Sequence, residues 1–140
     1  MLDSIFDTNV LVAGLRSRNG ASHQLLRLAA SGKIRLHISV ALALEYEDVL
    51  KRPDLLPGIT VAEVDRFLSY LFSISNLEES VVVRRPNLRD PDDESILELA
   101  VLCKATIVTH NVRDFAGSER LGVMVLTPRQ FLKQMGGSLA

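Results

Sequence analysis

Hydrophobic residues in this chain follow two spacings that alternate along its length. Short apolar or alternating runs, typical of strands, precede Asp7, cover residues 34–38, 81–83 and 105–109, and occur again at 123–126. Between these runs, apolar residues recur every three or four positions, as they do in amphipathic helices. Strands that alternate with helices predict a three-layer α/β/α domain, with a mainly parallel central sheet of four to five strands.

Residues at the expected helix boundaries support this division. Ser22 and Ser39 are each expected to cap the helix that follows. Thr60 and Glu63 have the spacing of a capping box, and Pro128 suits the first turn of the last helix. In the helix that begins after Ser39, the expected core positions are Val40, Leu42, Val49 and Leu50.

The length of the chain fits one domain. Its 140 residues, 47% of them hydrophobic, are enough to bury a single sizeable core. We therefore expect one domain over residues 1–140, with a frayed tail over 136–140. The sequence shows no secretory signal pattern and no apolar run of membrane-spanning length, which favours a cytoplasmic protein without membrane contact. The single cysteine, Cys103, is expected to be a small buried residue in a reduced interior.

Carboxylates are concentrated at the ends of the expected elements. Asp7 and Asp114 come just after two of the strands, and the run from Asp90 to Glu94 opens a helix with four carboxylates in five positions. Ligands of open α/β sheets bind at the carboxyl ends of the strands, so these segments can converge on one edge. Carboxylates packed this closely repel one another, which is more than helix capping requires and indicates a bound cation.

The types of residue at this edge indicate which cation and which chemistry. A site rich in carboxylates, without a histidine or cysteine cluster at ligand spacing, selects Mg²⁺ or Mn²⁺ over zinc. Such ions, about 2.0–2.2 Å from carboxylate oxygens, polarise a phosphodiester and generate hydroxide from water, so the residues predict phosphate-ester hydrolysis. The formal net charge of −1 gives no strong overall attraction for nucleic acid, and contacts with a polyanion would depend on local arginines.

Four segments, taken in order, resemble the PIN-domain family. They are Asp7-Thr-Asn-Val10, Glu45 in the helix after the second strand, Arg89-Asp-Pro-Asp-Asp-Glu94, and Val108-Thr-His-Asn-Val-Arg-Asp-Phe115 followed by Gly122-Val-Met-Val-Leu-Thr-Pro128. The resemblance runs from residue 2 to about residue 133. It is nearest to the VapC-like ribonucleases that act as toxins of type II toxin–antitoxin pairs.

The resemblance implies a PIN-like domain that cleaves single-stranded RNA as a metal-dependent endoribonuclease. It also implies one or two Mg²⁺ or Mn²⁺ ions, a cognate antitoxin and a homodimer. The catalytic and metal-binding residues that it implies are Asp7, Glu45, Asp93 and Asp114, with Glu94 or Asp90 as alternatives to Asp93. Supporting roles fall to Asn9, Thr109 and Asn111. Arginines expected on loops where they can bind RNA phosphates include Arg16, Arg18, Arg89 and Arg113.

Two other interpretations stay open at this stage. Asp7-Thr-Asn9 also resembles the Asp-x-Asp motif of haloacid-dehalogenase-type phosphatases, although that chemistry uses an aspartate as proton donor where this chain has Asn9. Trapping a phosphoryl group on Asp7 would identify such a phosphatase. The second alternative is a non-catalytic module on the same scaffold that binds RNA or a protein partner, for which Asp7→Asn would leave function intact.

Overall fold

The computed structural model describes residues 2–78 and 91–136 and contains a five-stranded sheet in which every strand pair is parallel. The strand order is β3-β2-β1-β4-β5, so the first strand of the chain is the central one. The strands are β1 (Leu2–Phe6), β2 (Ile34–Ser39), β3 (Ser75–Glu78), β4 (Thr106–Val108) and β5 (Val125–Leu126). The expected mainly parallel sheet is therefore confirmed at the upper end of the expected strand number.

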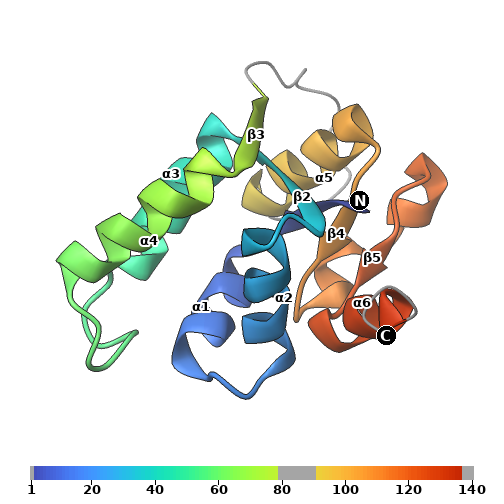
Figure 1. Cartoon of the computed structure of the whole chain (residues 1–140). Coiled ribbons are helices and arrows are strands. Elements are labelled where there is room, and N and C mark those ends of the chain that lie inside the picture. Colours follow the sequence, from blue (N-terminus) through green and yellow to red (C-terminus); the bar gives the residue numbers. More distant parts are fainter. Residues whose placement is uncertain (1, 79–90, 137–140) are drawn as a thin grey trace.

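Helices occupy most of the connections between the strands (Figure 1). The α-helices are α1 (Thr8–Arg16), α2 (Ala21–Ala30), α3 (Val40–Leu50), α4 (Val61–Ser73), α5 (Pro91–Cys103) and α6 (Pro128–Gln134), and the 3-10 helices are η1 (Val112–Phe115) and η2 (Ser118–Leu121). The connection through α1 and α2 leads from β1 to β2, whereas the one through α5 crosses the sheet in the opposite direction, from β3 to β4. Because parallel crossovers are right-handed, these two connections place their helices on opposite faces of the sheet, which gives the three layers.

The core is built around β1 and the helix α5, which packs on β1, β2 and β4. Ile5 and Phe6 of β1 are fully buried, and so is Leu99 of α5. Strand β1 can be apolar on both faces because helices cover both faces of a parallel sheet. Because the central strand β1 ends at Phe6, the next residue, Asp7, lies at the carboxyl end of the middle of the sheet.

Most of the expected helix caps are present. The Ser39 hydroxyl accepts a hydrogen bond from the Leu42 backbone N–H over 3.1 Å and caps α3. Thr60 and Glu63 form the expected capping box of α4. Pro128 begins α6, as expected, and Thr127 forms a second capping box there with Gln130, which the sequence interpretation had not identified.

The prediction that Ser22 caps a helix is wrong. Helix α2 begins at Ala21 with Gly20 in the cap position, so Ser22 lies inside the first turn. Its hydroxyl is instead hydrogen-bonded to Nε2 of His110 over 2.9 Å. The Ser22 side chain, which the local sequence predicted to cap the helix, therefore binds a residue that is distant in the sequence.

Two further differences concern the apolar pattern. Val40 was expected in the core but is 54% exposed, because α3 buries the face that carries Leu42, Tyr46 and Leu50. The expected strand at residues 81–83 lies outside the described residues, as do residues 137–140 of the expected frayed tail. The strand β3 at Ser75–Glu78 was not predicted.

Among the described residues, no helix has the length and apolarity needed to cross a membrane.

Candidate metal-dependent active site

Asp7 is fixed at the carboxyl end of the central strand by its own backbone and by the helix that follows. Its backbone N–H donates to the carbonyl of Val108 over 2.9 Å and extends the pairing of β1 with β4. Its side-chain Oδ1 accepts a hydrogen bond from the Thr8 backbone N–H over 2.8 Å, and Asp7 is the N-cap of α1. The carboxylate is 9% exposed and lies where the helix dipole stabilises a negative charge.

Polar side chains from the end of β4 and from the first turn of α1 surround the other oxygen of Asp7. The Thr109 hydroxyl donates to Oδ2 over 2.7 Å, and the Asn9 amide donates to the same oxygen over 3.3 Å. Asn111 donates its backbone N–H to the Thr109 hydroxyl over 3.0 Å. The side-chain oxygen Oδ1 of Asn9 accepts a hydrogen bond from the His110 backbone N–H over 3.1 Å. The structure thus brings Asn9, Thr109 and Asn111, the three expected supporting residues, to one place.

Glu45 of α3 reaches the same region from a different element. The Thr8 hydroxyl donates to Oε2 of Glu45, while the Thr8 backbone N–H donates to Asp7. A single residue therefore connects the two carboxylates. Glu45 is half-buried, which differs from a freely solvated surface glutamate.

The neighbouring residue Tyr46 lies beside both carboxylates. Tyr46 is fully buried and donates its phenolic O–H to the backbone carbonyl of Phe6, directly before Asp7. Burial raises the pKa of Tyr46 well above its usual value, and the charges of Asp7 and Glu45 raise it further. The hydrogen bonds through Thr8, and not this pKa, place both carboxylates at one end of the sheet.

Helix α5 contributes the third acidic segment. It packs against α3 and β1, and Ser95 and Ile96 line a small hollow together with Glu45. Glu94 is buried, at 9% exposure, and Asp93 is half-buried. The first turn of α5 therefore faces the helix that carries Glu45. Asp90, the remaining alternative, lies outside the described residues.

Asp114 differs from the other acids because its side chain is exposed. It is exposed in η1, and its backbone N–H donates to the carbonyl of Asn111 over 3.0 Å. The 3-10 helix η1 follows β4, whose carboxyl end lies beside that of β1, so the chain enters η1 from the edge of the sheet that carries Asp7. Its link to Asp7 runs through Asn111 and Thr109 rather than through a direct contact that the structure shows.

A groove of about 480 Å³ begins beside the residues that follow Asp7. Thr8 and Asn9 form one end, and the basic side chains along it are Arg16 and Arg52. Arg52, in the turn after α3, was not among the arginines expected from the sequence, because only the tertiary structure places it opposite α1.

The other expected arginines lie in different places. Arg18 lines a separate hollow between α2 and α4, together with His23 and Phe67. Arg113 is exposed on η1, and Arg89 lies outside the described residues.

The donors at this site fit a hard divalent cation. Asp7, Glu45 and the acids of the first turn of α5 offer carboxylate oxygens, which are the ligands that Mg²⁺ and Mn²⁺ prefer. Asp7 is also braced by Thr109 and Asn9, as ligating carboxylates usually are by the groups around them. Asp7, Glu45 and either Asp93 or Glu94 are the residues that could hold such an ion.

Fold and site together define an α/β domain with an acidic site at the carboxyl end of the central strand of a parallel sheet. The sequence matches the PIN-domain family over residues 3–113. The chain belongs to this family. No curated protein sequence gives a significant match to it.

Solved structures share this fold at low sequence identity. VapBC from Salmonella typhimurium, in a DNA-bound crystal structure, is 17% identical, with a TM-score of 0.63 over 91% of this chain and 99% of that chain. VapBC2 from Rickettsia felis, bound to a DNA fragment from the promoter, is 16% identical, with a TM-score of 0.61 over 90% and 98%. A domain of a functionally unknown protein from Methanocaldococcus jannaschii is 17% identical, with a TM-score of 0.52 over 89% of each chain.

Proposed function

We propose that this protein is an endoribonuclease that hydrolyses phosphodiester bonds of single-stranded RNA with Mg²⁺ or Mn²⁺, and that it is the toxin of a toxin–antitoxin pair. The observation that carries the nuclease proposal is the joint position of Asp7 and Glu45, which share Thr8 and act on the same buried Tyr46. Membership of the PIN family supports it, because PIN domains in general depend on divalent metals. The fold that the chain shares with VapBC proteins supports the toxin assignment.

The residues of the chain divide the work of such a reaction. Asp7, Glu45 and Asp93, with Glu94 or Asp90 as alternatives to Asp93, would hold the one or two ions, and Asp114 would act from the rim of the site. A bound divalent ion supplies a water with a lowered pKa and stabilises the charge that develops on the phosphate oxygens. Thr109 and Asn9 keep the Asp7 carboxylate in one orientation, so that its oxygens face the site without reorganisation.

The groove beside Thr8 and Asn9 supports RNA as the substrate. Arg16 and Arg52 lie along it, and positive side chains spaced along a groove suit the phosphates of an extended strand. With a net charge of −1 the protein as a whole does not attract RNA, so such local contacts would have to position the strand. Arg113 on η1 would contact phosphate on the other side of Asp7.

We infer two protein partners from the VapC-like assignment. One is a cognate antitoxin, and the other is a second copy of this chain in a homodimer. The long apolar pair of helices α3 and α4, which lie side by side in Figure 1, exposes Leu44 and Tyr70 and is available for such contacts. A cytoplasmic location follows from the same assignment.

The decisive experiment uses purified chain and a labelled single-stranded RNA, with Mg²⁺, with Mn²⁺ and with a chelator. We expect cleavage only with the divalent ions, and loss of cleavage in Asp7→Asn. Asparagine caps helices as well as aspartate does, so this substitution preserves the start of α1. Glu119→Gln, which changes an exposed carboxylate on η2, is the matched control and should cleave normally.

The alternatives give distinct outcomes in the same assay. Cleavage by Asp7→Asn at the rate of the unchanged protein would end the proposal and favour the non-catalytic module. A phosphatase would release phosphate from small phosphomonoesters and leave a phosphoryl group on Asp7, whereas the nuclease leaves the protein unmodified. The observed side chain of Asn9, already bonded to Asp7 and to the His110 backbone, is positioned as a brace and argues against the phosphatase.

A further inference from the structure

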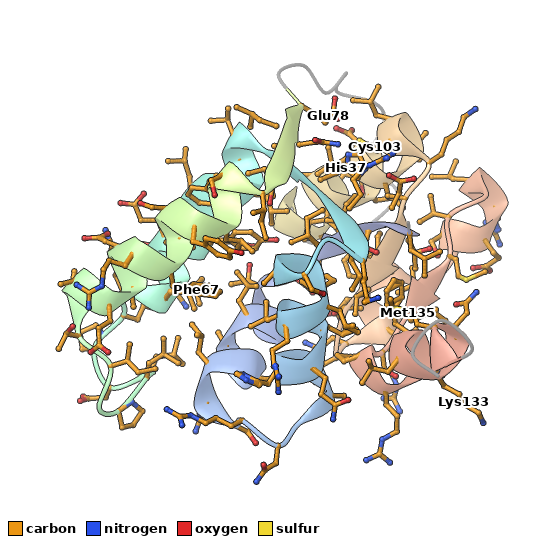
Figure 2. All side chains as sticks on the ribbon, viewed as in Figure 1. His37, Phe67, Glu78, Cys103, Lys133 and Met135 are labelled. Carbon is orange, nitrogen blue, oxygen red and sulfur yellow. The ribbon has the colours of Figure 1, made fainter. Side chains whose placement is uncertain are left out.

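A second group of potential metal ligands lies away from Asp7, where three elements meet. His37 comes from β2, Glu78 is the last residue of β3, and Cys103 is the last residue of α5. One ligand atom from each lies within 4.8 Å of the other two. Figure 2 shows these three labelled side chains gathered at one place beside α5. None of them belongs to the acidic site described above.

We propose that His37, Glu78 and Cys103 form a zinc-binding site, with a water molecule as the fourth ligand, that ties β2, β3 and α5 together. An imidazole nitrogen, a carboxylate oxygen and a thiolate sulfur are the three types of atom that bind zinc in proteins. The thiolate sets this site apart from the acidic site, whose oxygen donors suit Mg²⁺ or Mn²⁺. Three protein ligands with one open position form a recognised type of zinc centre.

The geometry around His37 suits this role. Its Nδ1 lies 3.4 Å from Oε1 of Glu78. Two ligands bound to one tetrahedral zinc ion at about 2.0–2.2 Å are roughly 3.3–3.6 Å apart, so the observed spacing already fits an ion between them. The His37 side chain is only 8% exposed, while that of Glu78 is 33% exposed, so the site has a buried inner side and a side that is open to solvent.

The other ring nitrogen of His37 has the partner that a zinc-binding histidine requires. Nε2 lies 2.8 Å from Oδ1 of Asp3, on the adjacent strand β1. A histidine that binds zinc through one nitrogen almost always donates the other N–H to a carboxylate or carbonyl, which fixes its tautomer and orientation. Asp3 is in turn held by Arg35, with Nη1 3.4 Å from the same oxygen.

The thiol completes the set from the far end of α5. Cys103 is half-buried, and burial and the nearby charge of Glu78 raise the pKa of its thiol to about 12. The thiol and the Glu78 carboxylate interact through their side chains. Zinc binding displaces the thiol proton, and the charge of the ion compensates the Glu78 carboxylate; the Asp3 carboxylate is already paired with Arg35.

The site is experimentally accessible because Cys103 is the only cysteine in the chain. Any thiolate–metal signal must therefore come from this residue. We would titrate chelator-treated full-length protein with Co²⁺ and then with Zn²⁺, and record absorption spectra and thiol reactivity. The expected result is a thiolate-to-cobalt charge-transfer band at one Co²⁺ per chain, its loss on addition of Zn²⁺, and at least tenfold slower thiol modification with zinc bound.

Variants separate a metal site from a simple hydrogen-bond network. Cys103→Ser should remove the charge-transfer band, and Glu78→Gln and Asp3→Asn should each weaken zinc binding roughly 10–100-fold. His23→Asn, which changes one of the two other histidines, should have no effect. Asp7→Asn should bind zinc normally, so this test does not depend on the proposed nuclease activity.

Thermal unfolding of the unchanged protein gives a second readout of zinc binding. Zinc at about a hundred times its dissociation constant should raise the Tm of the unchanged protein by roughly 5–10 °C. The same excess of Mg²⁺ should not reproduce the effect in Asp7→Asn. The proposal is overturned if Co²⁺ produces no charge-transfer band and zinc leaves the thiol as reactive as before. In that case His37 is simply a buried imidazole held between Asp3 and Glu78.

Discussion

Thr109 donates its hydroxyl to Oδ2 of Asp7 over 2.7 Å, although the two residues are 102 positions apart in the chain. The contact exists because β1 and β4 are neighbours with Phe6 opposite Val108, so the residues after each strand emerge side by side. Thr109 is fully buried and also accepts from Asn111 and Asn9, so its hydroxyl joins β4 to the acidic site.

The first prediction concerns this hydroxyl. Thr109→Val keeps the shape of the side chain but removes the donor to Asp7, so the carboxylate is less well oriented for a metal ion. We expect the Mg²⁺ requirement to rise and the cleavage rate to fall roughly 10–100-fold, the usual range for groups that orient metal ligands. Cleavage rates measured over a range of Mg²⁺ concentrations check this.

Thr109→Ser is the matched control, because serine retains the hydroxyl and loses only a methyl group. It should recover most of the activity. Full activity in the valine variant, with loss in the serine variant, would show that packing of the methyl group matters and that the hydrogen bond to Asp7 does not.

A second prediction concerns Tyr46, whose phenol is buried beside two carboxylates. Its raised pKa means that the folded state holds the phenolic proton more tightly than the unfolded state does. Its contribution to stability is complete at neutral pH and is lost as pH rises beyond the usual tyrosine value of 10.0. We expect the free energy of unfolding to fall in that alkaline range, and the fall to be smaller in Tyr46→Phe.

Tyr70 provides the control, since it is the only other tyrosine and is half exposed. In Tyr70→Phe, every phenolate signal comes from Tyr46 and should appear only as the protein unfolds at high pH. At neutral pH, Tyr46→Phe should cost about 1 kcal/mol for the lost hydrogen bond to Phe6. Reversible phenolate absorbance in folded Tyr70→Phe near pH 10 would contradict this account.

What the sequence could predict depended on how local each feature is. The end of β1 at Asp7, the cap at Ser39 and the capping box at Thr60 depend on neighbouring residues, and the structure confirms them. The cap assigned to Ser22 failed because His110, 88 residues away, binds the same hydroxyl. A local preference gives the right answer only where no distant partner competes for the side chain.

Features made by the tertiary structure had no signal in the sequence. Strand ends and family motifs predicted Asp7 and Glu45 as metal-binding residues. Their connection through Thr8, however, depends on how α3 packs against α1. His37 and Glu78 are 41 residues apart, and no ligand spacing linked them to Cys103. The sequence therefore indicated the acidic site and gave no indication of the second cluster.

A third prediction tests the groove and depends on the proposed nuclease function. Replacing Arg16 or Arg52 by glutamine should weaken RNA binding and raise KM roughly 3- to 10-fold, with little change in kcat, because both residues line the groove that is proposed to hold the strand. Each change should also reduce the slope of log binding constant against log salt concentration by about 1, the contribution of one phosphate contact. Steady-state kinetics and binding at several salt concentrations measure both effects.

The control for the groove is Arg129→Gln, which removes the same charge from the exposed surface of α6. Equal effects of all three substitutions would show that only net charge matters. A fall in kcat without a change in KM for Arg52→Gln would place that residue at the reacting phosphate instead of along the strand.

The last prediction concerns the start of α4, the helix that covers α3 beside the groove. Thr60 and Glu63 exchange hydrogen bonds, with the Glu63 carboxylate accepting from the Thr60 backbone N–H and hydroxyl over 3.0 Å each. These bonds hold the pKa of Glu63 below its usual value of 4.5, so they stabilise the folded protein above that pH and are lost as pH falls through the lowered value. Thr60→Ala should lower the free energy of unfolding at pH 7 by roughly 0.5–2 kcal/mol and move the pKa of Glu63 back toward 4.5. Carboxylate chemical shifts followed by NMR between pH 2 and pH 6, together with urea unfolding, measure the two effects.

The control is Thr60→Ser, which keeps the hydroxyl and should retain both the lowered pKa of Glu63 and most of the stability. An unchanged Glu63 pKa in Thr60→Ala would show that the Thr60 hydroxyl contributes nothing to the lowered pKa.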